Sequence, residues 1–235
     1  MDKKKLNKIL LIASQVFFGL FIVLIILLLT VDRKEVGPDD AVIGLSTINV
    51  NIFSKLGFNP NWEKVSKYLG YSAIFICCAF GVMGLIQWIV RKKFLAVDVE
   101  IFLLGVFYII CIIVYVFFSV ISINYRPILV LNSANEFEME LSFPSSHTIL
   151  GVFVFCSAAL VLPRYVKIKY VLIPSQVLLF GLAILMMVSR LISGVHWFTD
   201  ILGAFLLSGF LLLMFLVLLN INVEYREKRE KGIEA

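Results

Sequence analysis

Residues 9–31 read ILLIASQVFFGLFIVLIILLLTV and contain no charged side chain. An α-helix needs roughly 20 predominantly apolar residues to cross about 30 Å of hydrocarbon, so this stretch predicts a transmembrane helix. Four lysines precede it, as in a signal peptide, but no small-residue cleavage site appears before Asp32. We therefore interpret the stretch as a retained first span.

The rest of the chain has the same apolar character. Its 235 residues are 61% hydrophobic, against roughly 45–50% in soluble globular domains, which excludes an ordinary soluble enzyme. The expected fold is an all-α, polytopic membrane protein of six helices, forming a single domain over residues 1–235. The other five spans are expected at 69–90, 99–121, 148–162, 171–188 and 199–220. The fourth is short, so we expect its helix to begin inside the preceding loop.

Lysine and arginine side chains are unevenly divided between the two sides of these spans. Fourteen lie at the termini and in two short connections, and seven lie on the other side. The positive-inside rule therefore predicts that both termini are cytoplasmic, with a charged cytoplasmic tail over 221–235. Basic segments beside a membrane explain the net charge of +5, so no nucleic-acid partner is expected. An outer loop over 32–68 is expected, either as an interfacial helix or as a folded cap without a catalytic part.

Groups that are costly at membrane depth gather in the two outer connections after the third and fifth spans. The first connection contains NYRP at 124–127 and SFPSSH at 142–147. The second reads SRLISGVHWFTD over 189–200 and, with the first, contains both histidines of the chain. Charge counting places the two connections on one side of the membrane, so we expect one site.

The spacing within these segments indicates a chemistry. His196 and Asp200 are four residues apart and share a face at the start of a helix, so the carboxylate can fix the imidazole tautomer. The other ring nitrogen is then free to attack an electrophile, and His147 remains as a second proton carrier. The Pro-Ser-Ser opening of the fourth span favours an anion, and two nearby arginines can clamp phosphate oxygens. This combination is typical of phosphoryl transfer.

These segments resemble the three-part signature of the type-2 phosphatidic acid phosphatase superfamily, which is K-x6-R-P, P-S-G-H and S-R-x5-H-x3-D. The residues that match are Arg126 and Pro127 in the first part, Pro144, Ser145 and His147 in the second, and Ser189, Arg190, His196 and Asp200 in the third. The signature region spans 119–200. The resemblance covers spans three to six, and the first two spans fit the family's six-helix layout without carrying a signature.

The resemblance implies a role for each matching residue. His196 would be the nucleophile that forms a phosphohistidine, Asp200 its partner, and His147 the acid that protonates the leaving group. The groups that would hold the phosphate are Arg126, Arg190, Ser145 and Ser146. The implied substrate is a lipid phosphate or pyrophosphate from the bilayer, such as phosphatidic acid, phosphatidylglycerophosphate or undecaprenyl pyrophosphate, cleaved at the extracytoplasmic face of the cell membrane.

Relatives in this family work without a metal ion or another cofactor, so none is expected here. The alternative is zinc, for which two histidines and Asp200 could supply three ligands. The four cysteines lie inside apolar spans without metal-type spacing and are interpreted as buried hydrophobic side chains. Tyr125, Trp197 and Phe198 are interpreted as interfacial aromatic residues.

The chain departs from the signature at two positions. Ser119 stands where the first part has its lysine, so one phosphate-binding cation is missing. Asn124, Tyr125 or a lysine from 32–68 could replace it. Ser146 stands where the second part has glycine, a milder change if only its backbone N–H is used. These departures leave open a lipid phosphotransferase with the same nucleophile, or a catalytically weak protein that binds lipid phosphate, and a transporter is less favoured.

Overall fold

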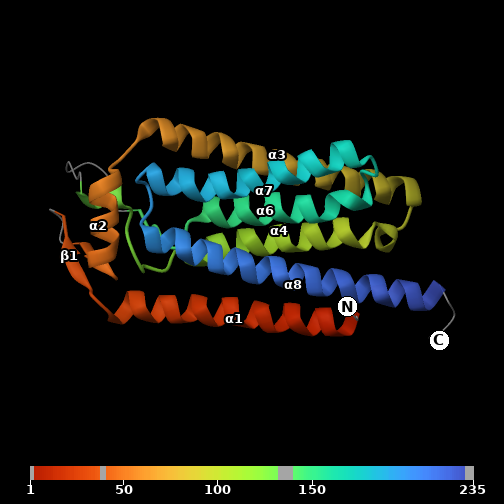
Figure 1. Ribbon diagram of the computed structural model, residues 1–235, viewed down its shortest axis with the longest axis horizontal. Helices are drawn as coiled ribbons and strands as arrows, with labels where there is room; N and C mark the ends of the chain where they lie inside the picture. The colour runs from red at the N-terminus through yellow and green to blue at the C-terminus, as the bar shows by residue number, and fades with distance from the viewer. Residues whose placement is uncertain (1–2, 38–40, 132–139, 231–235) are drawn as a thin grey trace.

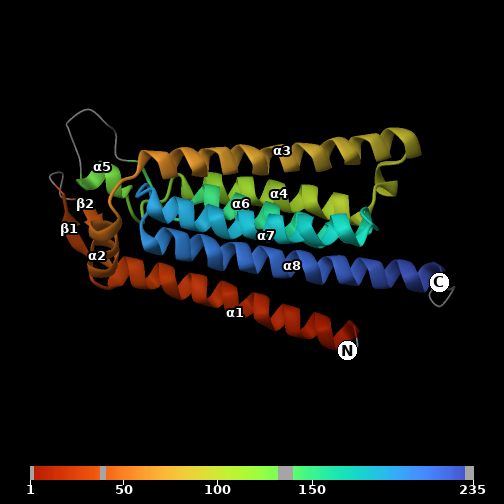
Figure 2. The same ribbon diagram turned by 45° about the horizontal axis from the view of Figure 1, so that its top comes forward.

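The computed structural model describes residues 3–37, 41–131 and 140–230. Six long helices run side by side as a bundle (Figures 1 and 2). They are α1 (Lys3–Thr30), α3 (Pro60–Arg91), α4 (Val99–Phe118), α6 (Ser146–Val161), α7 (Lys169–Ile192) and α8 (Phe198–Glu230). Each is long and apolar enough to cross a bilayer, α6 together with the short helix η2 (Leu162–Arg164) that continues it. The predicted helical fold with six spans is confirmed.

Short elements cover one end of this bundle. A hairpin of β1 (Lys34–Val36) and β2 (Ala41–Ile43) pairs Lys34 with Ile43 in antiparallel register. It is followed by α2 (Ser46–Leu56), and α5 (Pro127–Leu131) lies at the same end. Helix α1 begins and α8 ends at the opposite end (Figure 1), where η1 (Phe94–Ala96) joins α3 to α4. All segments that carry the signature therefore meet near the covered end.

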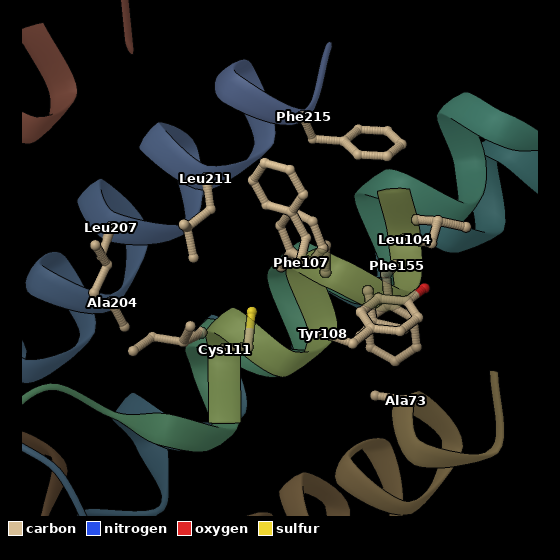
Figure 3. Close-up of a cluster of buried hydrophobic side chains, with 14 of the residues drawn as sticks. Ala73, Leu104, Phe107, Tyr108, Cys111, Phe155, Ala204, Leu207, Leu211 and Phe215 are labelled. Carbon is tan, nitrogen blue, oxygen red and sulfur yellow. The ribbon is translucent and has the colours of Figure 1, made fainter. Parts of the chain in front are cut away.

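The centre of the bundle lies between α4, α6 and α8. Phe107 of α4 stacks on Phe153 of α6 with ring centroids 5.6 Å apart, and meets Phe215 of α8 edge-on at 5.7 Å. Figure 3 shows Phe107 on the side of α4 that faces α8. In the most apolar stretch of each helix, 61% of the residues of α6 are buried, against 6% of those of α3. Helix α6 is therefore the most enclosed helix. A residue at the start of α6 is thus held by the best-packed part of the protein.

Helix α3 begins earlier than predicted. The sequence predicts residues 60–68 as part of the outer loop 32–68, but they form the first turns of this helix. The Asn59 side chain accepts hydrogen bonds from the backbone N–H groups of Asn61 and Trp62, and Pro60 occupies the first turn, a strong start signal for a helix. The predicted span 69–90 rests on hydropathy, which indicates the part of a helix that contacts lipid. It does not indicate where the helix itself begins.

Two other boundaries differ for the same reason. Helix α7 runs to Ile192 and ends just before Gly194, whose φ is +70°, so Arg190 lies in the last helical turn and not in a loop. Helix α8 continues past the apolar segment to Glu230, because no glycine or proline interrupts residues 210–230. The predicted tail 221–235 is therefore helical as far as it is described. The start of α6 at Ser146 confirms that the fourth span begins before 148.

Parts of three predicted regions lie outside the described residues. These are 38–40 in the outer loop, 132–139 in the signature region and 231–235 in the tail.

Candidate active site

Backbone hydrogen bonds bring the signature segments together at the covered end of the bundle. The segment before α5 pairs with the segment before α6, since Arg126 N–H donates to the Glu140 carbonyl at 3.0 Å and Ser142 N–H to the Asn124 carbonyl at 2.9 Å. At the start of α6, Ser145 N–H donates to the carbonyl of Asp200 in α8 at 3.3 Å. The two outer connections form one site, as their polar residues predict.

His196 and Asp200 make the contact that their spacing predicts. The His196 Nδ1 atom lies 3.3 Å from Asp200 Oδ2, and both side chains are buried. His196 precedes α8 by two residues, while Asp200 lies in its first turn. The same carboxylate oxygen accepts the Trp197 backbone N–H at 3.0 Å, as in one half of a capping box. Asp200 therefore caps α8 and orients His196 at once.

The free nitrogen of His196 is suited to attack. Among the described residues, its buried Nε2 atom has no hydrogen-bond partner, and the ring lines a cavity of about 450 Å³. Burial, with Arg190 and Arg126 nearby, holds the pKa of the His196 ring well below its usual value. The ring is then neutral at pH 7, and donation from Nδ1 to Asp200 leaves the lone pair on Nε2.

Two arginines flank this ring with unused donors. Arg190 is 3% exposed and donates from Nη1 to Ser66 Oγ of α3 at 3.1 Å. Arg126 forms an ion pair with Glu140 at 3.0 Å. Within the part of the chain that the structure describes, the buried Nε atom of each arginine has no acceptor. Because buried donors are rarely left unpaired, these N–H groups are available to an anion.

Two cavities meet beside Arg126. His196 lines the cavity of about 450 Å³, and His147 lines a second cavity of about 410 Å³ between α3 and α4. The residues that line both are Tyr115, Arg126 and Ser146. A phosphate at the junction of the two cavities would face one histidine from each side.

Ser146 and Ser145 are placed differently. Ser146 lines both cavities at the start of α6. Ser145 is fully buried. Its hydroxyl accepts a hydrogen bond from Thr148 at 3.0 Å, and its N–H donates to the Asp200 carbonyl. The polar groups of Ser145 thus hold the start of α6 against Thr148 and Asp200, and a direct contact of Ser145 with phosphate stays a prediction.

These segments lie within the match to a known family. The model of the PAP2 superfamily matches residues 101–224, more than half of the chain and the whole span from Arg126 to Asp200. The chain belongs to the PAP2 superfamily. This agrees with the resemblance carried by the signature, and with the six apolar helices it makes the chain a multi-pass membrane protein.

A solved structure has the same fold as this PAP2 chain. It is a transmembrane PAP2-type phosphatidylglycerolphosphate phosphatase from Bacillus subtilis, with a TM-score of 0.58 and 18% sequence identity. The similarity covers 86% of this chain and 94% of that chain. A search of curated proteins gave no match.

Several residues that support the PAP2 site are not in its signature. Asn49 of α2 is fully buried and exchanges two hydrogen bonds with Thr199 at the start of α8, at 2.9 and 3.2 Å. The outer loop therefore holds the segment that carries His196, as a folded cap would. Trp197 is 1% exposed and donates from Nε1 to the Tyr125 carbonyl at 2.6 Å. It is part of the core under α2, so its interpretation as an interfacial residue was wrong.

Helix α3 also contributes residues that the signature does not contain. Ser66 is the partner of Arg190. Gly70 faces His147, since a Cβ atom at that position would lie 3.1 Å from His147 Cδ2. The start signal at Asn59 and Pro60 would have placed these residues on one helix, but nothing in the sequence indicates which helix they face.

The distribution of acidic, histidine and cysteine side chains bears on metal binding. Over residues 3–37, 41–131 and 140–230, no group of three or more of them could hold a metal ion. The possible zinc set of two histidines and Asp200 is not assembled in this arrangement.

Proposed function

We propose that this PAP2 chain is a membrane phosphatase that cleaves a lipid phosphomonoester or pyrophosphate through a phosphohistidine on His196. The observation that carries the proposal is the buried, unpartnered Nε2 of a neutral ring, whose Nδ1 faces Asp200. Nucleophiles in enzymes are commonly arranged in this way, with a third group orienting the base.

The reaction has two phosphoryl transfers. In the first, His196 Nε2 attacks phosphorus while the bond from phosphorus to the leaving oxygen breaks. His147, which in its cationic form beside the bound phosphate carries a second proton, gives that proton to the leaving oxygen and becomes neutral. In the second, His147 takes a proton from water, the water oxygen bonds to phosphorus, and the P–N bond breaks to release inorganic phosphate. Each histidine returns to its starting state, and no redox partner is needed.

Positive charge and backbone donors would hold the phosphate. Arg190 and Arg126 carry the unused Nε donors, and Arg126 would exchange Glu140 for the more strongly charged phosphate. Ser146 would donate its backbone N–H at the start of α6, where the helix dipole favours an anion. Such preorganised charge supplies most of the catalysis in phosphoryl transfer.

The proposed substrate is a lipid. The cavity that His147 lines is otherwise mostly apolar and lies between α3 and α4, with Ile74 and Ile112 on its walls, so an acyl or prenyl chain could enter from the bilayer. Phosphatidylglycerophosphate, which the Bacillus subtilis protein's description names, phosphatidic acid and undecaprenyl pyrophosphate are the first candidates. The excess of basic residues at the other end of the bundle supports an extracytoplasmic site.

The test is phosphate release by the purified chain in detergent micelles, with EDTA present. The panel contains these three lipids, and the wild type is compared with His196→Ala and with Lys64→Met, which changes an exposed residue of α3. We expect release by the wild type and by Lys64→Met, and loss of at least about 10³-fold in His196→Ala.

Four results would change the proposal. Equal release by His196→Ala would exclude this residue as nucleophile. No release by the wild type from any lipid would favour a protein that only binds lipid phosphate. Transfer of phosphate to a second lipid, in place of free phosphate, would identify a phosphotransferase. Inhibition by EDTA that added metal reverses would contradict the proposed metal-independent chemistry.

A further inference from the structure

The position of the missing signature lysine offers no charge. Ser119 follows the last residue of α4, donates its hydroxyl to the Val116 carbonyl at 2.8 Å and lines the cavity of His196. Removing one preorganised donor from a site of developing negative charge typically costs about 10²–10³ in rate. A cation from another element would restore the charge.

Helix α3 forms a wall of the site and carries such a cation. Ser66 accepts a hydrogen bond from Arg190, and Gly70 lies against the ring of His147. Lys67 lies between Ser66 and Gly70 in the sequence and lines the cavity into which His147 opens. Its charge acts on the His147 ring. Of the described lysines, Lys67 alone lines either of the two cavities.

Lys67 forms a weak ion pair with Glu63 that a phosphate could replace. Its ammonium lies 2.7 Å from Glu63 Oε1, one helical turn away, and the two side chains are 53% and 25% exposed. Exposed pairs of this kind are weak and screened by salt. A phosphate between the two histidines carries more charge than one carboxylate, and the flexible lysine side chain allows the ammonium to turn toward it.

The other candidates for the missing cation are uncharged and already engaged. Asn124 accepts the Gly44 backbone N–H on its side-chain oxygen at 3.0 Å. The Tyr125 hydroxyl accepts a hydrogen bond from Ser122 at 3.0 Å. Neither lines the two cavities that the structure describes beside the histidines. Lys67 is therefore the candidate that the contacts favour.

We infer that Lys67 of α3 replaces the signature lysine as a phosphate-binding cation, exchanging Glu63 for a phosphate oxygen beside Arg126 and Ser146. This assignment rests on the proposed phosphatase function. It places the third positive charge on the cavity of His147, opposite to the cavity that Ser119 lines. Charge on this side stabilises the negative charge that develops on the leaving oxygen.

The experiment compares matched variants of the full chain in detergent micelles. Lys67→Met removes the charge and keeps the length, Lys67→Arg keeps the charge, and Lys64→Met removes an exposed charge from the same helix. The double variant Ser119→Lys with Lys67→Met returns a cation from α4. Each variant is measured for kcat/KM with phosphatidic acid and, without turnover, for the Kd of inorganic phosphate.

We expect Lys67→Met to lower kcat/KM by about 10²–10³-fold, which is the cost of one preorganised donor, and to weaken phosphate binding by at least about tenfold. Lys67→Arg should recover most of both, Lys64→Met should match the wild type, and the double variant should regain at least about tenfold over Lys67→Met. Equal values for Lys67→Met and Lys64→Met would overturn the assignment while leaving the phosphatase function intact. If the wild type released no phosphate, the proposed function would fail, and phosphate binding alone would still decide the role of Lys67.

Discussion

Gly70 gives the sharpest test of how closely the site is packed. A Cβ atom at this position would lie 3.1 Å from His147 Cδ2 and 3.6 Å from Nε2, whereas ordinary contacts are 3.4–4 Å. Gly70→Ala must therefore push the ring away by at least about 0.3 Å. A misplacement of about 1 Å in an active site can cost about 10²-fold. On this scale a shift of about 0.3 Å corresponds to a fall in kcat/KM of about 4-fold, which is the loss that we expect.

The variant should remain folded, because His147 is exposed to its cavity and the ring has room to move. Gly81→Ala is the matched control, since it lies on the same helix and no described atom comes within 4 Å of its added Cβ. Both substitutions gain about 1 kcal/mol of helix propensity, so thermal unfolding in detergent should not separate them. Only the rate of lipid-phosphate hydrolysis should differ.

A double-mutant cycle decides whether the loss passes through His147. In a His147→Gln background the proposed acid is already absent, so Gly70→Ala should add little further loss. Equal rates for Gly70→Ala and Gly81→Ala in the wild-type background would refute the packing argument. An undiminished effect of Gly70→Ala in the His147→Gln background would show that the added methyl group acts elsewhere.

Three further predictions concern the segment from 196 to 200. Asp200→Asn should fold with its amide oxygen at the position of Oδ2, where it can still accept both the Trp197 N–H and the His196 Nδ1–H. The carboxylate charge beside the phosphorylated ring is lost, so hydrolysis should fall by about 10²–10³-fold; a rate within tenfold of wild type would contradict this. In His147→Gln, one histidine remains, and its NMR signals should stay those of a neutral ring at pH 6.5, because burial lowers the His196 pKa. The free energy of unfolding should fall as the pH drops below about 6.5, because the unfolded chain then takes up a proton that the folded ring does not. Titration of the folded ring at 6.5 or above would exclude the lowered value. Trp197→Phe removes the hydrogen bond to the Tyr125 carbonyl and should reduce the free energy of unfolding by about 1–3 kcal/mol. The measurement is the unfolding temperature in detergent, which should be lower than that of the wild type. An unchanged temperature would mean that the hydrogen bond contributes nothing.

The number and order of the spans could be predicted because hydropathy reports contact with lipid. The helix ends could not, because a helix continues wherever its backbone is paired. Residues 60–68 are polar enough to read as a loop, yet Asn59 and Pro60 start a helix there. Residues 221–230 are charged and still helical. The early start of α3 matters because the first turns of this helix reach the site.

The core of the site could be predicted from local spacing, and its outer wall could not. His196 and Asp200 are four residues apart, so helix geometry predicts their contact. The structure differs only in that the helix begins at Phe198, so that His196 lies just before it. Ser66 meets Arg190 across 124 positions of the chain. Such a contact depends on how α3 packs against α6 and α7, which no local pattern encodes.

On the proposed function, the same distinction explains why one part of the PAP2 signature can change while another is kept. The nucleophile needs a definite tautomer, and only a carboxylate at a fixed distance from Nδ1 supplies it, so His196 and Asp200 must remain together. A phosphate needs positive charge within reach, and charge acts over several ångströms from any wall of the cavity. A lysine can therefore move from α4 to α3, as Ser119 and Lys67 suggest, whereas moving Asp200 to another element would require His196 to be reoriented as well. We expect an enzyme with a relocated cation to retain activity, and the double variant Ser119→Lys with Lys67→Met measures this. We expect an enzyme without the orienting carboxylate to lose activity, and Asp200→Asn measures that loss.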